Sequence, residues 1–263
     1  MEIVLDDGYQ FGLGVFETIA VEKSRLLFLD WHLERMAHSL RELGIRQTVT
    51  KRQVTEYLTS HRTDRAALKI MVSDKNIVFT MRPNPYTAEK AGKGFRLLYS
   101  SVYRNETSPL VGHKTMNYGD CLLEKRRTAL MGADELIFLN SRGEICEGTV
   151  SNIFFVSGGR LFTPPVSCGL LPGIVRRFVM ESFSVTEQVL RREDAAKMEE
   201  CFVTNSLMGI MPVVALGETV FHKRTVTERC RRVYEQTIAF YTRERCDFIR
   251  NFVLTEIEEA LTR

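Results

Sequence analysis

The chain has 263 residues, of which 44% are apolar, so it can bury a sizeable core as one large domain or two smaller ones. Its 36 basic and 33 acidic residues are interleaved, which disfavours a nucleic-acid partner and is compatible with a small carboxylated substrate. The acidic start MEIVLDDGYQ and the lack of an apolar run of about 18 to 20 residues argue against a secretion signal or a membrane span. We expect a cytoplasmic protein whose six cysteines, at least 16 residues apart, stay reduced and bind no metal.

The first half of the chain predicts a small α/β unit. Residues 11–30 have the pattern of two strands around a turn at residues 22–25. The next residues predict a helix with Asp30 as its N-cap and Gly44 as its stop, and Arg35 lies opposite the apolar stripe of this helix. By that pattern alone Arg35 is a solvated side chain. A short helix and three strands are then expected at residues 51–60, 66–72, 76–82 and 94–102.

The second half begins after a polar, proline-containing joint at residues 104–112. Its expected elements are a helix ending near Gly132, strands at 135–139, 151–156 and 160–165, a helix from about 172, strands at 185–190 and 201–205, a hairpin at 213–221 and a long helix from about 225. This order predicts a two-lobed α/β protein of the α+β type. We expect a smaller N-terminal domain at residues 1–106 and a larger domain at 107–263 that ends in a helical extension.

Lys114, in the stretch SPLVGHKTMNYGD, is the first candidate for chemistry. A free lysine has a pKa near 10.4, so only about one in 10³ is a neutral nucleophile at pH 7. Condensation with the aldehyde of pyridoxal 5'-phosphate removes this handicap, and such a site also needs a carboxylate and an anion site. Taken alone, Lys114 is a solvated surface residue and Glu147 an exposed acid at a strand end or turn. The glycines of FGLGVFE do not form a dinucleotide-binding motif, because the third glycine is missing and no helix follows.

The stretch LPGIVR predicts the anion site. The backbone N–H groups of Gly173, Ile174 and Val175 are unpaired at the start of a helix, and such groups bind anions. The hydroxyls of Thr204 and Ser206, in TNSLMGIMPV, are further candidate donors. By itself, LPGIVR is an ordinary helix start, so this prediction depends on the other pieces.

The order of these pieces resembles the fold type IV pyridoxal phosphate enzymes, the class IV aminotransferase family. The similar blocks, in family order, are FGLGVFETI, HLERM, HKTMNY, GEICEGTVSNIFF, GLLPGIVRR and TNSLMGIMPV. The resemblance implies a two-lobed fold like that of D-amino-acid aminotransferase, a homodimer, and pyridoxal phosphate as cofactor. It implies that Lys114 bonds the cofactor covalently, that Glu147 pairs with the pyridine nitrogen and that Tyr118 bonds the phenolic oxygen. The phosphate would be held by Arg35, Ile174, Val175 and Ser206.

Two blocks indicate the reaction. The asparagine in TNSLMGIMPV and the stretch RNETSPLVGHKTMNY are similar to family members that eliminate pyruvate from 4-amino-4-deoxychorismate to give 4-aminobenzoate for folate biosynthesis. Arg104 is then a candidate partner for a substrate carboxylate, and Asn205 for orienting the substrate or stabilising the leaving group. Asn152 is expected to brace a strand or turn. The alternatives are an aminotransferase of branched-chain or D-amino acids and, with less support, a non-catalytic cofactor-binding protein.

Overall fold

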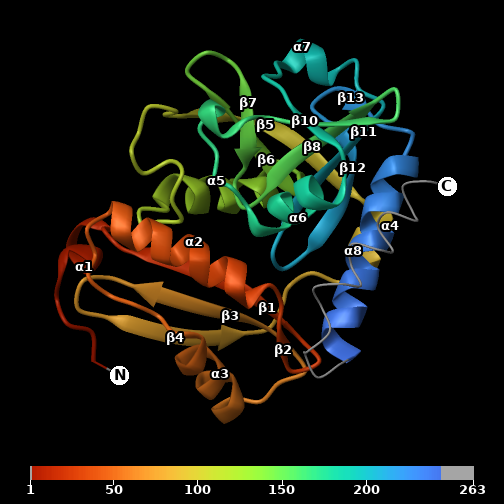
Figure 1. The fold of residues 1–263 in the computed structure, drawn as a ribbon. Coiled ribbons are helices and arrows are strands. Elements are labelled where there is room, and N and C mark those ends of the chain that lie inside the picture. Colours follow the sequence, from red (N-terminus) through yellow and green to blue (C-terminus); the bar gives the residue numbers. More distant parts are fainter. Residues whose placement is uncertain (1, 244–263) are drawn as a thin grey trace.

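The computed structural model describes residues 2–243 and shows two lobes with a helix along one side of both (Figure 1). The helices of the smaller lobe are α1 (Asp7–Phe11), α2 (Leu29–Glu42) and α3 (Lys51–Ser60), and its strands are β1 (Val15–Glu22), β2 (Arg25–Leu26), β3 (Arg65–Val72) and β4 (Ile77–Arg82). The strands form an antiparallel sheet in the order β2-β1-β3-β4. The predicted extension beyond residue 243 lies outside the described residues.

Successive side chains along each strand of the small sheet point to its two opposite faces, which have different roles. On β1, Val15, Ile19 and Val21 pack with α2 and α3 in one apolar core. Phe16 and Thr18 point the other way, and β3 pairs in a register that places Met71 opposite Phe16 and Lys69 opposite Thr18. This second face lines a cavity between the lobes, so the small sheet serves as one wall of the site.

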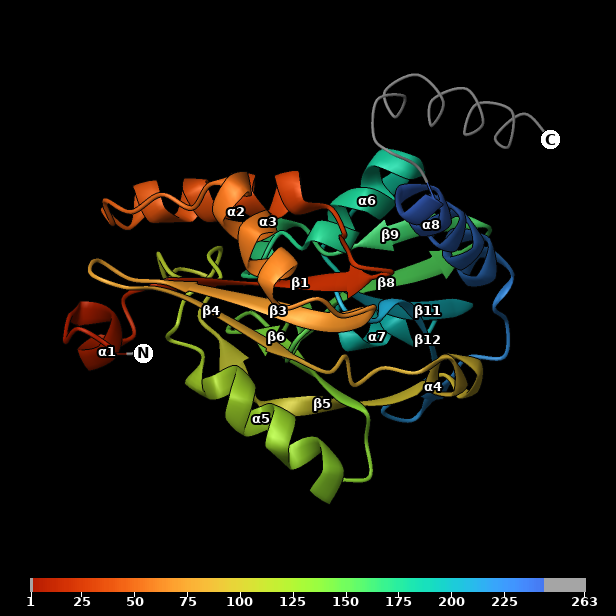
Figure 2. The ribbon, with the colours of Figure 1, turned by 90° about the horizontal axis from the view of Figure 1, so that it is seen from below.

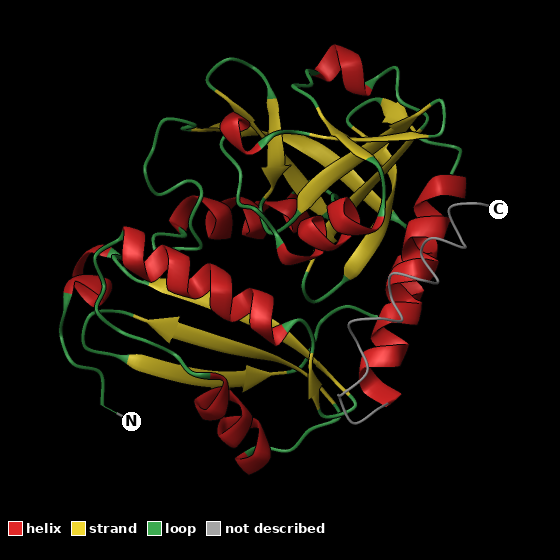
Figure 3. Ribbon diagram, in the orientation of Figure 1, coloured by secondary structure: helices red, strands yellow, loops and turns green. Residues whose placement is uncertain are grey.

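The larger lobe is built on a nine-stranded mixed sheet in the order β10-β9-β8-β11-β12-β5-β6-β7, with β13 paired to β12. Figure 3 shows the strands of both lobes in yellow. Its strands are β5 (Phe95–Arg104), β6 (Glu135–Asn140), β7 (Ile145–Gly148), β8 (Asn152–Ser157), β9 (Arg160–Thr163), β10 (Val185–Glu187), β11 (Glu200–Asn205), β12 (Gly209–Leu216) and β13 (Thr219–Val220). Its helices are α4 (Ala88–Lys93), α5 (Gly119–Leu130), the 3-10 turn η1 (Val166–Cys168), α6 (Ile174–Ser182), α7 (Arg192–Ala195) and α8 (Thr225–Arg243).

An aromatic cluster joins the lobes. Phe28 stacks on Trp31 with ring centroids 5.1 Å apart and also meets Phe178 of α6 and Tyr234 of α8. Seen from below in Figure 2, α6 and α8 lie next to the end of β1 where this cluster forms. Burial of several aromatic rings makes this contact a large apolar junction, so the two lobes are parts of one packed structure.

Most of the predicted elements are confirmed, and three differences have physical causes. The N-cap of α2 is Phe28, with a left-handed φ of 52°, because this residue is held by the aromatic cluster; Asp30 lies inside the first turn. Strand β7 and the short helices α1, α4 and α7 were not predicted, since elements this short carry too little periodicity. Strand β5 pairs with β6 and β12, so the change of sheet falls between β4 and β5, ahead of the expected division at residue 106.

Among residues 2–243, no helix combines the length and the apolar character needed to cross a bilayer.

Candidate active site

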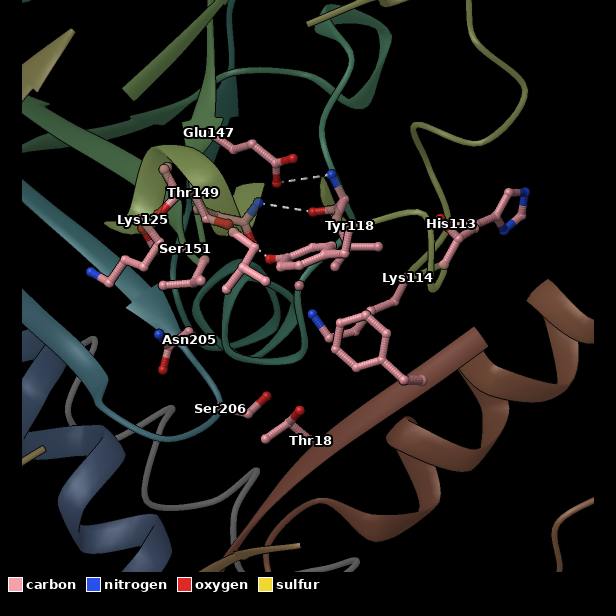
Figure 4. Close-up of a pocket in the computed structure, with 18 of the residues that line it drawn as sticks. Thr18, His113, Lys114, Tyr118, Lys125, Glu147, Thr149, Ser151, Asn205 and Ser206 are labelled. Carbon is pink, nitrogen blue, oxygen red and sulfur yellow. Dashed lines mark hydrogen bonds between the residues drawn. The ribbon is translucent and has the colours of Figure 1, made fainter. Parts of the chain in front are cut away.

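A cavity of about 950 Å³ lies between the two lobes (Figure 4). It is within the size range of small-molecule and cofactor sites. All eleven residues that were predicted from the sequence line it: Arg35, Arg104, Lys114, Tyr118, Glu147, Gly173, Ile174, Val175, Thr204, Asn205 and Ser206. They come from both lobes and from positions far apart in the chain.

Lys114 reaches the cavity from a segment that crosses between the lobes. Its carbonyl accepts a 2.8 Å hydrogen bond from the N–H of Phe16, and Thr115 forms a β-bridge with Val15, so this segment extends the edge of the small lobe. The ammonium lies 4.5 Å from the ring centroid of Phe16 and 5.3 Å from that of Tyr118. Burial, assisted by the charge of Arg35, lowers the pKa of Lys114 to about 8. At pH 7 roughly one molecule in ten then carries a neutral amine, about a hundredfold more than for a free lysine.

Glu147 lies on β7 and is almost fully buried. Its carboxylate accepts a 2.6 Å contact from the guanidinium of Arg104 and a 3.1 Å hydrogen bond from the N–H of Leu171. Burial raises the pKa of Glu147, while Arg104 and Lys114 act against the rise. These two contacts anchor the carboxylate at the wall of the cavity.

Arg104 was expected to contact a substrate carboxylate, but its side chain is paired with Glu147. Its guanidinium pairs with Glu147, contacts the sulfur of Cys121 at 3.1 Å and stacks over Phe138 with its carbon 4.7 Å from the ring centroid. The attraction of Glu147 raises the pKa of Arg104 despite its burial, so the pair is held as two charges. In this structure Arg104 supports Glu147.

Arg35 points inward, contrary to its position on the helical wheel. Its Nε and Nη2 donate to the two carboxylate oxygens of Glu17 at 2.7 Å each, and its Nη1 donates to the carbonyl of Pro172 at 2.9 Å. The Pro172 contact fixes the guanidinium beside the start of α6. His32 adds a 2.6 Å contact from Nδ1 to the same carboxylate. Although burial raises the pKa of Glu17, the charge of Arg35 and the hydrogen bonds from Arg35 and His32 outweigh it and hold the value near 2.

Glu17 and His32 were missed by the sequence reasoning. Glu17 occupies a position between Val15 and Ile19 on the face of β1 that packs against α2, where an acid is costly unless it is paired. His32 and Arg35 stand three residues apart on α2 and therefore project from the same side. The sequence does contain a pattern that indicates this contact: an acid at a core-facing position of a strand, followed by two basic residues on one side of the next helix.

The start of α6 fits an anion. Gly173 is the N-cap and makes no side-chain cap bond, which leaves the first N–H groups of α6 without side-chain partners. Asn152 donates from Nδ2 to the carbonyl of Leu171 at 2.8 Å, so it braces this turn as expected. The hydroxyl of Thr204 is buried without a hydrogen-bond partner in the described chain. A buried polar atom without a partner is costly, and an oxygen of a bound anion would satisfy it.

Tyr118 and Asn205 complete the cavity wall. The hydroxyl of Tyr118 donates to the carbonyl of Thr149 at 2.8 Å, and burial raises its pKa well above the usual range, so it stays protonated. The side-chain oxygen of Asn205 accepts from the N–H groups of Leu207 and Met208 at 2.9 Å each. Its amide nitrogen makes a long 3.4 Å contact with a tyrosine hydroxyl and is the part of Asn205 that remains available for a ligand.

Residues 14–216 match the family described as amino-transferase class IV. The chain belongs to this family. It is 27% identical over 263 aligned positions to aminodeoxychorismate lyase of Bacillus subtilis, covering 89% of this chain and 88% of the relative. It is 29% identical over 258 positions to a putative branched-chain-amino-acid aminotransferase of Methanocaldococcus jannaschii, again covering 89% and 88%. Class IV proteins are pyridoxal phosphate enzymes, which confirms the predicted family and cofactor.

Solved structures confirm the predicted fold. The structure of a putative 4-amino-4-deoxychorismate lyase from Legionella pneumophila matches with a TM-score of 0.81 and 26% identity, over 90% of this chain and 95% of that one. The branched-chain aminotransferase of Escherichia coli matches with a TM-score of 0.79 at 24% identity, over 94% and 92% of the chains. A hypothetical aminotransferase from Mycobacterium tuberculosis in its PLP-bound form matches with a TM-score of 0.75 at 20% identity. The two-lobed fold type IV architecture is therefore shown.

Proposed function

We propose that this protein is a pyridoxal phosphate-dependent 4-amino-4-deoxychorismate lyase, which eliminates pyruvate and produces 4-aminobenzoate for folate biosynthesis. The observation that carries the proposal is that Lys114, Glu147, Asn205 and an anion cradle line one cavity. The anion cradle consists of Arg35, the first N–H groups of α6 and the hydroxyls of Thr204 and Ser206. The lyase of Bacillus subtilis and the Legionella protein, both similar over about nine tenths of this chain, support it.

The residues present fit the cofactor at three points. Arg35, the first N–H groups of α6 and the hydroxyls of Thr204 and Ser206 would hold its phosphate, and the Thr204 hydroxyl, which has no partner within residues 2–243, is the sign of a missing acceptor or donor there. Glu147 would hold the pyridine nitrogen, with Arg104 fixing the carboxylate. Lys114 would bond the aldehyde, and Tyr118 would lie beside it. Bound pyridoxal phosphate supplies an aldehyde that joins to an amine and a protonated ring that withdraws electrons from the carbon bearing that amine.

Lys114 is the residue that moves the proton. Its lowered pKa makes the neutral amine accessible, so Nζ can take the proton from the amine-bearing ring carbon of the substrate. The rings of Phe16 and Tyr118 limit the positions that Nζ can occupy. The bond between the neighbouring ring carbon and the enolpyruvyl oxygen then breaks, pyruvate leaves after protonation, and the remaining ring becomes aromatic. The amide nitrogen of Asn205, whose one contact in the described chain is the long one to a tyrosine hydroxyl, would donate to the departing oxygen.

The deciding experiment supplies 4-amino-4-deoxychorismate as the sole substrate. A lyase releases pyruvate and 4-aminobenzoate in equal amounts through many turnovers without a keto acid, because elimination returns the aldehyde form of the cofactor. Product that stops at one equivalent per site would refute the proposal. Lys114→Ala is the control: it should abolish turnover, and borohydride reduction should no longer label residue 114.

An aminotransferase is the second candidate, and the 29% identity to the Methanocaldococcus protein favours it. It predicts turnover with branched-chain amino acids or D-amino acids only when a keto acid is present. A non-catalytic cofactor-binding protein is less well supported, since both Lys114 and Glu147 are retained in the cavity.

We also infer a cytoplasmic homodimer. The five cysteines in the described part of the chain are buried free thiols, as expected in a reducing compartment. Leu122, Leu123 and Leu130 on α5 are exposed, as are apolar residues of the N-terminal segment, and a second copy would cover them. Light scattering should give about twice the chain mass of 30.2 kDa; an active monomer would contradict the inference.

A further inference from the structure

Two cations stand on the cavity face of the small sheet. Lys69 lies on β3 opposite Thr18, and Arg82 lies at the end of β4 opposite Ala67, two positions along on the same face. Both line the cavity. Neither was singled out by the sequence, and neither has a role in the chemistry derived above.

The charge of these two residues is not balanced by an acid within residues 2–243. Three other cavity cations each lie beside a carboxylate, in the pairs Arg35–Glu17, Arg104–Glu147 and Lys125–Glu135. In the described part of the chain, Lys69 instead has only the ring of Phe16, 4.4 Å from its ammonium, and Arg82 has one 3.3 Å hydrogen bond to the carbonyl of Pro83. Burial, and then the charge of Arg82, lowers the pKa of Lys69, as expected for an ammonium that lacks an anionic partner.

We propose that Lys69, supported by Arg82, binds the substrate carboxylate that lies across the ring from the reacting amine. This inference rests on the proposed lyase function and names the substrate group that this wall recognises. It also replaces Arg104, whose guanidinium is committed to Glu147, as the contact for a substrate carboxylate.

The position of Lys69 agrees with such a substrate. The nitrogens of Lys69 and Lys114 lie 4.4 and 4.5 Å from the same Phe16 centroid, so they are at most about 9 Å apart. The reacting amine must take a place beside Lys114. A six-membered ring carries its amine and its carboxylate on opposite carbons, so a substrate with its amine beside Lys114 can direct its carboxylate along the same cavity wall towards Lys69. Pairing with a carboxylate would also restore the electrostatic balance that Lys69 lacks.

The test compares two ligands of the same shape, 4-aminobenzoate and its neutral analogue 4-aminobenzamide, binding to the cofactor-loaded enzyme in calorimetry. Wild type should prefer the acid by about tenfold, the value of one charge-assisted hydrogen bond. Lys69→Met keeps the aliphatic stem on Phe16 and should bring the ratio close to one. Lys69→Arg should retain most of the preference, and Lys51→Met, an exposed lysine of the same lobe, should leave it unchanged.

Kinetics provide the second readout. Lys69→Met should raise KM for 4-amino-4-deoxychorismate about tenfold with kcat within about twofold of wild type, because the contact is made equally before and during the reaction. An unchanged acid-to-amide ratio in Lys69→Met, or an equal loss of both ligands, would overturn the inference. Because ligand binding requires no turnover, a protein that releases no pyruvate yet shows the Lys69-dependent ratio would refute the lyase function alone.

Discussion

Gly173→Ala is the sharpest test of how the anion cradle is built. Gly173 has φ −70° and ψ 150°, a conformation that alanine adopts freely, so the substitution adds no backbone strain. A Cβ at this position would nevertheless lie far inside van der Waals contact with Oδ1 of Asn152. Unbonded atoms cannot approach so closely, so the amide of Asn152 or the start of α6 must move.

The size of the effect follows from the contacts that the movement breaks. Overpacking at a buried site costs about 1–3 kcal/mol. Turning the Asn152 amide away also loses its 2.8 Å hydrogen bond to Leu171, worth about 1 kcal/mol. We expect Gly173→Ala to lower the free energy of unfolding by about 2–4 kcal/mol and to weaken binding of pyridoxal phosphate. In an Asn152→Ala background the amide is gone and the next neighbour is the Cβ of Arg176 at 3.6 Å, so the same substitution should cost less than about 0.5 kcal/mol.

Urea unfolding of wild type, Gly173→Ala, Asn152→Ala and the double variant measures how strongly the two substitutions depend on each other. Titration with pyridoxal phosphate measures whether the cofactor still binds at the start of α6. Gly119→Ala is the matched control, because Gly119 also stands at a helix start, has an ordinary φ and leaves open space where its Cβ would lie, with no atom of the described chain within 4 Å. It should be neutral. Equal costs of Gly173→Ala in the wild-type and Asn152→Ala backgrounds would refute the steric explanation.

The fold could be predicted to the extent that elements are long and regular. Helix α3 spans residues 51–60, as its apolar spacing predicts, and the structure adds a capping box at Thr50 that closes its start. The start of α2 could not be placed, since Asp30 is a good N-cap by composition whereas the real cap, Phe28, is held by aromatic partners from α6 and α8. Those contacts are between residues far apart in sequence, so no local pattern contains them.

The same distinction holds for the site. Lys114 and Glu147 could be assigned to one site from the sequence, because their motifs resemble those of the family and occur in the same order. Arg35 shows the limit of local reasoning, because the helical wheel turns it to solvent while Glu17 and the Pro172 carbonyl hold it in the cavity. A wheel distinguishes one apolar stripe from the rest, but α2 has two packed sides: one on the sheet core and one on this polar contact.

Two further predictions concern Glu147 and Glu17, two buried acids of the site. Glu147→Gln should still bind cofactor through the phosphate cradle and Lys114, but kcat per bound cofactor should fall by at least about tenfold; undiminished turnover would contradict the role of the carboxylate. Glu17→Gln tests the pair with Arg35. Because the pKa of Glu17 is about 2 when folded and about 4.5 when unfolded, its ionisation stabilises the fold above pH 4.5 and this stability is lost as the pH falls from 4.5 towards 2. The shift corresponds to about 3 kcal/mol, since one pKa unit is about 1.4 kcal/mol. Urea unfolding between pH 6 and pH 3 should therefore show a steep loss of stability in wild type and a shallower one in Glu17→Gln, which lacks the titrating carboxylate. Parallel slopes for the two proteins would mean that Glu17 is not ionised against Arg35 in the folded state.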